Sequence, residues 1–154
     1  MFGRKEVSRK QPTPESLRKS MLKCLERKGL QYGIDGEDIT AKANDQFGYL
    51  INIYDQHVDI MGILTGFKVS KAQRDQFIWK MNLINVNLSF GRFSVNPDGI
   101  VFYSYGHVCM DSSPSVALFE AMLGLMEDLI MAEYPELKAM AERNDVAERD
   151  PGYA

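Results

Sequence analysis

The segment FGYLINIYDQHVDIMGIL, residues 47–64, constrains the fold most strongly, because apolar and more polar side chains alternate on both sides of a short polar stretch. This alternation is typical of β-strands that are buried on one face. A two-residue turn at Asp55 and Gln56 pairs the two halves, and a shift by one residue would move every apolar side chain to the wrong face. The predicted opposite pairs are Ile53–Val58, Ile51–Ile60, Tyr49–Gly62 and Phe47–Leu64 on one face, and Asn52–Asp59 and Leu50–Met61 on the other.

A second hairpin is predicted at residues 89–105 (SFGRFSVNPDGIVFYSY), around an Asn-Pro-Asp-Gly turn at 96–99. Pro97 presets the first corner of the turn, and Gly99 can adopt the positive φ that closes it. With a four-residue loop, the predicted pairs are Val95–Ile100 and Phe93–Phe102 on the core face, and Ser94–Val101, Arg92–Tyr103 and Phe90–Tyr105 on the other face. The second face therefore carries more aromatic surface than a solvated face needs.

Two helices are predicted before this hairpin. The first begins at Thr13, which can cap it, has Pro14 in its first helical position and ends before Gly29. The second covers residues 71–88, and Trp79 lies off its apolar stripe, so we expect Trp79 to contact another element or a partner. Three Asn side chains near its end predict bonds to neighbouring backbone rather than catalysis. They are Asn82, Asn85 and Asn87.

A third helix is predicted to begin at Ser113 and Pro114 and to end at Tyr134 and Pro135, with one more helical stretch to about residue 142 as an option. Apolar side chains cover more than half of its circumference. They are Leu118, Phe119, Met122, Leu123, Leu125, Met126, Leu129 and Ile130. A helix this apolar is either buried on two sides or covered by another subunit.

These segments, with one or two short strands in residues 30–42, predict the α+β class and the element order α-β-β-β-α-β-β-α. The length of 154 residues fits one domain. We expect a flexible basic arm at residues 1–12, a single domain at residues 13–135, and a short helical extension with a polar tail at residues 136–154.

Charge is distributed unevenly along the chain. Residues 1–28 hold nine Lys or Arg against three Glu, a net charge of +6, so the remainder carries −9. A basic segment of this kind can attract nucleic acid, but a solvated helix face with an arm drawn to the acidic body is the interpretation we favour. Cys24 and Cys109 follow no metal or redox spacing, and no apolar run approaches a signal peptide or a membrane span. We therefore expect a cytoplasmic protein without membrane contact.

Residues able to do chemistry are few. His107, Cys109 and Asp111 alternate along a predicted strand, which invites a Cys nucleophile with a His base, or part of a metal site. A structural zinc site needs four ligands, and ordinary strand packing explains the pattern as well. His57 and Asp59 form a similar pair beside a turn. Because no phosphate-binding or dinucleotide-binding motif accompanies these residues, we expect no catalytic residue, metal, cofactor or small-molecule substrate.

The stretch MNLINVNLSFGRFSVNPDGIVFYSYGHVCM, with the apolar helix from Ser113, resembles the YbjN-like domain family, whose relatives in fold are the class I type III secretion chaperones. The resemblance covers roughly residues 14–135, and its best-matching part runs from Asn82 and Asn85 to the turn at Gly99. It implies an antiparallel sheet with helices packed on one face, commonly dimeric and without catalytic activity. Secretion chaperones of this fold bind extended segments of client proteins, and YbjN-like proteins are described as regulators of sensory transduction.

We therefore expect a non-catalytic protein-binding domain, chaperone-like or regulatory, that acts as a homodimer through apolar surface. The candidate protein-binding residues are Phe90, Arg92, Tyr103, Tyr105, Met122 and Met126. Tyr and Arg suit an interface because each combines a broad contact area with a polar end. Three alternatives stay open: the chain itself covers the aromatic face, the basic arm contacts nucleic acid as part of a regulator, or His107 and Cys109 serve a small enzyme.

Overall fold

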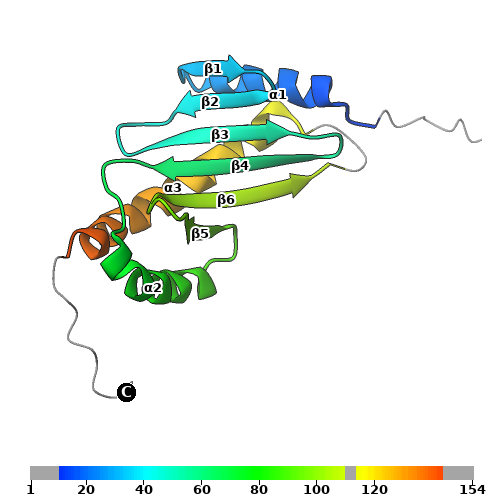
Figure 1. Cartoon of the computed structure of the whole chain (residues 1–154). Coiled ribbons are helices and arrows are strands. Elements are labelled where there is room, and N and C mark those ends of the chain that lie inside the picture. The colour runs from blue at the N-terminus through cyan, green and yellow to red at the C-terminus, as the bar shows by residue number, and fades with distance from the viewer. Residues whose placement is uncertain (1–10, 110–113, 144–154) are drawn as a thin grey trace, which may run out of the picture.

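The computed structural model describes residues 11–109 and 114–143, which form three α-helices and one six-stranded sheet (Figure 1). In chain order the elements are α1 (Pro14–Arg27), β1 (Tyr32–Asp35), β2 (Asp38–Lys42), β3 (Phe47–Ile53), β4 (His57–Leu64), the short 3-10 turn η1 (Lys71–Gln73), α2 (Arg74–Val86), β5 (Arg92–Val95), β6 (Val101–Val108) and α3 (Val116–Glu142). The α+β class is confirmed. The order approximates the predicted one: four strands rather than three precede α2, because residues 30–42 supply two strands, β1 and β2. Most of the predicted arm at residues 1–12 lies outside the described residues.

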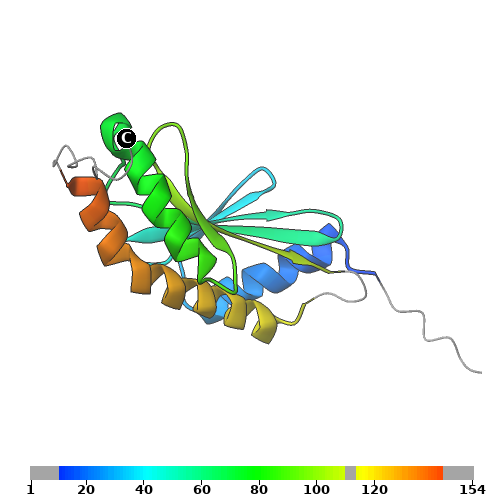
Figure 2. The ribbon, with the colours of Figure 1, turned by 90° about the horizontal axis from the view of Figure 1, so that it is seen from below.

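The strands form one antiparallel sheet in the order β1-β2-β3-β4-β6-β5. Figures 1 and 2 show all three helices on the same side of this sheet, with α2 beside β5 at one end. Within the described part of the chain, no helix lies on the opposite side, which we call the uncovered face. Alternate strand positions supply its side chains: Thr40, Leu50, Met61, Ile63, Phe102 and Ser104.

The β3–β4 hairpin has the predicted register. Ile53 lies opposite Val58, and the pairing continues to Phe47 and Leu64 at the far end. The Tyr54 N–H donates to the His57 carbonyl at 2.9 Å, which closes the two-residue turn. The alternation of side chains thus determines both the pairing and the face that is buried.

The first helix also forms as predicted, because its end signals are local. The Thr13 side chain accepts from the Ser16 N–H at 3.1 Å, and the Ser16 hydroxyl accepts from the Thr13 N–H at 3.0 Å, so two otherwise unpaired backbone donors are satisfied. Pro14 occupies the first position of α1. The predicted stripe is buried: Leu17, Met21, Cys24 and Leu25.

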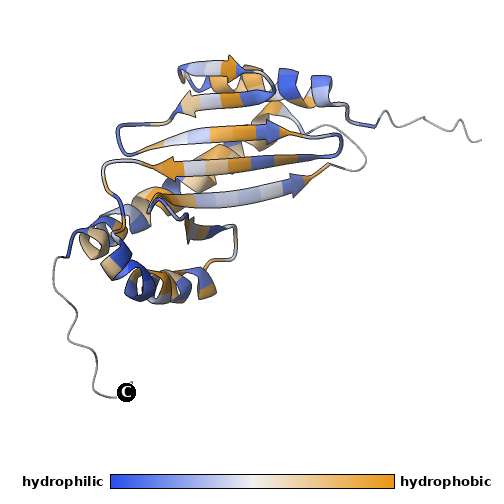
Figure 3. Ribbon diagram, in the orientation of Figure 1, coloured by the Kyte–Doolittle hydropathy of each residue, from blue (hydrophilic) through white to orange (hydrophobic). Residues whose placement is uncertain are grey.

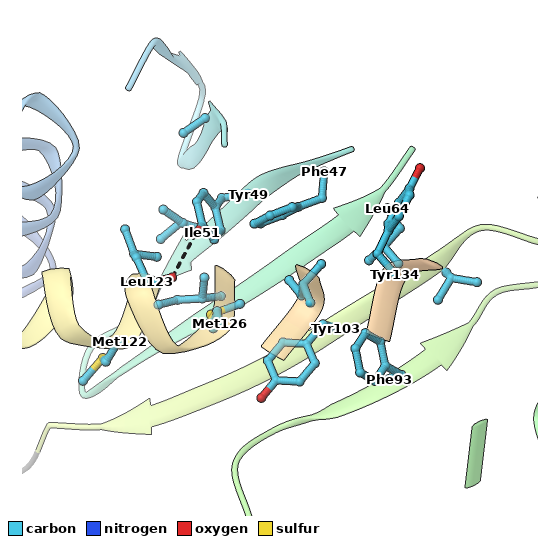
Figure 4. Close-up of a cluster of buried hydrophobic side chains, with 14 of the residues drawn as sticks. Phe47, Tyr49, Ile51, Leu64, Phe93, Tyr103, Met122, Leu123, Met126 and Tyr134 are labelled. Carbon is cyan, nitrogen blue, oxygen red and sulfur yellow. Dashed lines mark hydrogen bonds between the residues drawn. The ribbon is translucent and has the colours of Figure 1, made fainter. Parts of the chain in front are cut away.

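The core lies between the sheet and α3 (Figure 4). Tyr49 and Ile51 point from β3 toward the helix, where they meet Leu123 and Met126. The Tyr49 hydroxyl donates to the Leu123 carbonyl at 3.0 Å, so the one polar atom of this side chain is paired. Burial raises the pKa of Tyr49 above its ordinary value.

The last helix does not end at Tyr134 and Pro135 as the sequence predicts, but continues to Glu142. A proline inside a helix removes one backbone hydrogen bond and costs about 3 kcal/mol. The buried side chains around and beyond Pro135 offset this cost, and the Tyr134 hydroxyl donates to the Thr65 carbonyl at 2.5 Å. The buried side chains beyond the proline are Leu137, Met140 and Ala141.

Candidate protein-binding surface

The β5–β6 hairpin is shifted by one residue from the predicted pairing. Val95 lies opposite Val101 rather than Ile100, and Phe93 lies opposite Tyr103 rather than Phe102. Because side chains alternate between the faces of a strand, this shift moves every residue of β6 to the other side. The predicted assignment of faces along β6 is therefore wrong.

The loop explains the shift. The Asn96 side chain accepts from the Asp98 and Ile100 N–H groups at 3.0 Å each, and the Gly99 N–H donates to the Asn96 carbonyl at 2.9 Å. Gly99 adopts a φ of 82°, so a turn is followed by one residue in the left-handed conformation, which lengthens the connection beyond the four residues predicted. The expected positive φ of Gly99 is confirmed, but its consequence for the register was missed.

Tyr103 consequently belongs to the core. It is fully buried, packs edge-on against Phe93 with 5.1 Å between the ring centroids, and donates its hydroxyl to the Phe90 carbonyl. Burial, with a smaller contribution from Tyr105, raises its pKa to about 12. Its predicted place on an outer aromatic face is wrong.

The other hairpin candidates do not share one face either. Phe90 and Tyr105 are half-buried and contact each other, with 3.9 Å between their ring centroids. Tyr105 follows Tyr103 by two positions and so lies on the side of the sheet that the helices cover. Arg92 is exposed and lies opposite Ser104 on the uncovered face. The sequence-predicted patch is therefore split between the two sides of the sheet.

Met122 and Met126 lie in the core with Leu123, facing the sheet (Figure 4). Helix α3 is covered by the sheet and by α1 within a single copy. Of the two explanations for its apolar circumference, burial on two sides therefore applies. Leu118 and Leu125 are the α3 residues left exposed among its large apolar side chains. The predicted use of Met122 and Met126 as accessible contact residues is therefore wrong.

The outward side of α2 supplies an apolar surface that residues 11–109 and 114–143 leave exposed. Trp79, Leu83 and Val86 expose 59%, 53% and 81% of their surface. Their spacing of four and three residues aligns them with Gln76 on one stripe, which we call the α2 outer face (residues 76, 79, 83 and 86). Lys80 is the only charged residue between positions 76 and 91, and none of the four positions of this stripe carries a charge. Figure 3 shows apolar segments recurring along α2.

Sequence reasoning identified only Trp79 of this face. The stripe at positions 79, 83 and 86 is visible in the sequence, but the inner stripe of the same helix also contains apolar residues, and periodicity alone does not say which one faces the core. Phe77 and Met81 are buried and so define the inner side. The scarcity of charge in this segment is the signal that could have identified the outer face.

The opposite side of α2 closes one edge of the sheet. The Asn85 side chain accepts from the Phe93 N–H at 2.8 Å and donates to the Phe93 carbonyl at 2.9 Å, as a neighbouring strand would. These bonds confirm for Asn85 the prediction that the Asn side chains bond to neighbouring backbone. Strand β5 therefore has part of its outer edge occupied by a side chain of α2.

His107 and Cys109 do not show the contacts of a nucleophile and its base. The His107 Nδ1 lies 3.2 Å from the Tyr105 hydroxyl, and the Cys109 thiol lies 3.8 Å from the backbone carbonyl of His107. Burial raises the pKa of the Cys109 thiol, whereas an activated cysteine has a lowered pKa. The third member of the predicted trio, Asp111, lies outside the described residues.

The remaining chemical candidates are modest. His57 Nε2 lies 3.7 Å from an Asp59 carboxylate oxygen, and the His57 ring stacks on Tyr54 at 4.3 Å beside the β3–β4 turn. Across residues 11–109 and 114–143, no three His, Cys, Asp or Glu side chains gather as they would around a metal ion. Nor does any helix of these ranges have the length and hydropathy needed to cross a membrane.

Comparisons with known proteins agree with this architecture. The crystal structure of YbjN from E. coli, described as "a putative transcription regulator", is 14% identical, with a TM-score of 0.63 over 83% of this chain and 93% of that chain. An uncharacterized protein from Methanothermobacter thermautotrophicus is also 14% identical, with a TM-score of 0.54 over 82% of this chain and 98% of that chain. At this identity the likeness shows a shared fold.

No curated protein matches the sequence. The model of the YbjN family, described as "Putative bacterial sensory transduction regulator", matches residues 18–139. That range contains every helix and strand of the sheet except the ends of α1 and α3. The chain therefore belongs to the YbjN family.

Proposed function

We propose that this domain is a non-catalytic, cytoplasmic regulator that acts by binding protein, and that it works as a homodimer. The description of the family as a sensory transduction regulator supports the regulatory part. The raised pKa of Cys109 and the pairing of His107 with Tyr105 support the non-catalytic part. The observation that carries the proposal is the α2 outer face, which exposes Trp79, Leu83 and Val86 on one uncharged stripe.

A second copy of α2 is the partner that this face fits best. Apolar residues spaced alternately by three and four positions form the seam by which two helices pack against each other. In an antiparallel pair centred near Leu83, Trp79 of each copy lies beside Val86 of the other. Because Gln76 and the neighbouring Asn side chains are uncharged, two identical faces meet without like-charge repulsion.

The size of the face sets the strength that we expect. A stable interface buries roughly 800 Å² on each partner, and tryptophan is among the residues that contribute most at its centre. Three exposed apolar side chains supply the centre of such an interface rather than its whole area. We therefore expect a dimer that dissociates on dilution.

Analytical ultracentrifugation of the full chain tests this proposal. The wild-type protein should sediment as a dimer at high concentration, and Leu83→Glu should be monomeric while keeping its circular dichroism spectrum and a cooperative unfolding transition. Ile34→Glu is the matched control, because Ile34 is 51% exposed at the opposite edge of the sheet. A monomeric wild-type protein, or equal dissociation of both variants, would contradict the α2 interface.

Contact with nucleic acid is the second candidate function. The net charge of +6 in residues 1–28 favours it, and the E. coli relative is described in terms of transcription. Binding carried by basic residues weakens steeply with added salt, because bound counterions are released. Duplex DNA binding that falls with salt and is lost when Arg4, Lys5, Arg9 and Lys10 are replaced by Gln would support this candidate, and binding that ignores both changes would dismiss it.

A further inference from the structure

The two edges of the sheet differ in how they are protected. At the β5 edge, the Asn85 side chain occupies the backbone of Phe93, and α2 packs alongside. At the other edge, all four residues of β1 are exposed. Strand β1, with the sequence Tyr-Gly-Ile-Asp, has none of the lysines or prolines that usually prevent an edge from pairing.

The hydrogen-bond pattern shows which groups of β1 are free to pair. The Lys42 N–H donates to the Gln31 carbonyl at 3.1 Å, so position 31 points its backbone groups toward β2. In an antiparallel pair the inward and outward positions alternate, and Gly33 and Asp35 therefore also point inward. Tyr32 and Ile34 direct their N–H and C=O groups away from the sheet, where they can bond to one further strand.

The side chains of these two residues lie on the helix-covered side of the edge. Tyr32 and Ile34 expose 38% and 51% of their surface. The Tyr32 hydroxyl donates to the Glu26 carboxylate at 2.9 Å, which fixes the ring against α1. An added strand would thus find a fixed tyrosine ring and an exposed isoleucine beside its own side chains.

On the uncovered face, the same strand borders a hollow of about 600 Å³. Its lining comes from strands β1 to β4 and adjoining loop residues and includes Gly33, Thr40, Gly48 and Ile63, with no residue of the three helices. Gly33 leaves the floor beside the edge without a side chain, and Thr40 and Lys42 of β2 line the next part, with Lys42 paired to Asp45 at 3.0 Å. Ile63 lies farther in, on β4, about 14 Å from β1 at the usual spacing between strands. The hollow has room for one large apolar side chain that leans inward from the edge.

We propose that β1 binds an extended segment of another protein as a seventh, antiparallel strand. Residues of this segment opposite Tyr32 and Ile34 exchange backbone hydrogen bonds with them and carry apolar side chains. The residue between these two, opposite Gly33, is large and apolar and enters the hollow. Backbone bonds provide the affinity in this mode of binding, and the side-chain pocket provides the specificity.

A second copy of β1 is a poorer occupant of this edge. Both pairs of outward groups are used only when Tyr32 of one copy lies opposite Ile34 of the other, which places Gly33 opposite Gly33. Neither copy then offers a side chain for the hollow. The partner is therefore a different chain, and the site is separate from the α2 outer face on which the proposed homodimer depends.

A defined peptide tests the proposal. The probe is fluorescein-labelled Lys-Thr-Val-Phe-Val-Thr-Lys, in which the two Val lie opposite Tyr32 and Ile34 and the Phe lies opposite Gly33. Fluorescence anisotropy should show saturable binding to the wild-type chain. Replacing Phe by Ala in the peptide should weaken binding by about tenfold or more, because the hollow is left empty.

Three controls separate the parts of the site. Ile34→Pro removes an outward N–H and should abolish binding, and N-methylation of both Val in the peptide should do the same without changing the protein. Gly33→Val fills the hollow, where an added Cβ meets only the Thr40 hydroxyl at 3.4 Å, and should remove the preference for Phe over Ala. Wild-type protein that does not bind the peptide, or N-methylated peptide that binds equally well, would overturn the proposal.

The same variants distinguish this site from the proposed homodimer. Leu83→Glu should bind the peptide as the wild-type protein does, whatever its oligomeric state. If Ile34→Pro instead dissociates a dimer in the ultracentrifuge, a second copy occupies the β1 edge and the proposal of a foreign strand is wrong. If the wild-type protein is monomeric but binds the peptide, the α2 homodimer fails and the β1 site stands.

Discussion

Asn85 shows how one side chain can take the place of a strand. Its carboxamide has one acceptor and donors in the same plane, so it can satisfy both backbone groups of Phe93 at once. Asn87, two positions later, makes a single bond of 3.3 Å to the Leu83 carbonyl of its own helix. The two residues look alike in the sequence, and only the position of β5 against α2 makes one of them a closing group for the sheet.

Tyr103 carries a pH dependence that we predict at the residue scale. Its ordinary pKa of 10 is raised by burial to about 12 in the folded chain, so the folded state keeps the proton that the unfolded state loses. Stability contributed by this group is complete below about pH 10 and falls as the pH rises toward 12, by an amount on the order of 2 kcal/mol. Tyr49 shifts in the same direction.

Urea unfolding as a function of pH tests this prediction. Tyr103→Phe should be less stable than the wild-type protein near neutral pH by about 1 kcal/mol, because the Phe90 carbonyl loses its donor. Above about pH 10 that difference should shrink and then reverse, since Phe has no proton to lose. A difference that stays constant from neutral to alkaline pH would show that Tyr103 ionises normally.

At the scale of elements, the β5–β6 loop determines which residues reach the core. The turn residues at positions 96–99 were recognised in the sequence, but the extra residue that follows the positive φ of Gly99 was not counted. Contacts outside the loop hold this geometry, because the Val69 N–H donates to the Gly99 carbonyl at 2.9 Å. When the geometry of a hairpin loop depends on a distant segment, the pairing of its two strands cannot be predicted from the local sequence alone.

Gly99→Ala is therefore expected to destabilise the protein strongly. A Cβ at this position would lie 2.2 Å from the Val69 carbonyl oxygen, in addition to the strain of a φ of 82°. Gly36→Ala is the matched control, because Gly36 has a φ of 61° but open space around its added Cβ. We expect a loss of about 1 kcal/mol for the control and about 3 kcal/mol for Gly99→Ala in urea unfolding. Equal losses would mean that contact with Val69 does not hold the loop.

For the whole molecule, features that depend on contacts between residues close in the sequence could be predicted, and features that depend on distant contacts could not. The caps of α1 and the β3–β4 register are local, and both were predicted from the residues. The burial of Met126, the extension of α3 past Pro135 and the closing of β5 by Asn85 depend on elements distant in the sequence. For an element with two apolar sides, such as α2 or β6, the sequence pattern therefore does not tell which side faces the core.

One continuous core joins these distant elements, and it predicts that the domain unfolds as a unit. Leu17 of α1 and Phe77 of α2 belong to the same buried cluster, although they lie on different helices.

Leu17→Ala should lower the free energy of unfolding by about 2–5 kcal/mol. Because Trp79 is the only tryptophan, its fluorescence reports on α2, and circular dichroism reports on the whole fold. With protein concentration held constant, both signals should shift to the same lower urea midpoint, since a single core transmits the loss. Separate midpoints for the two signals would show that α2 and its outer face unfold independently of the sheet. The α2 outer face would then not belong to the same cooperative unit as the core.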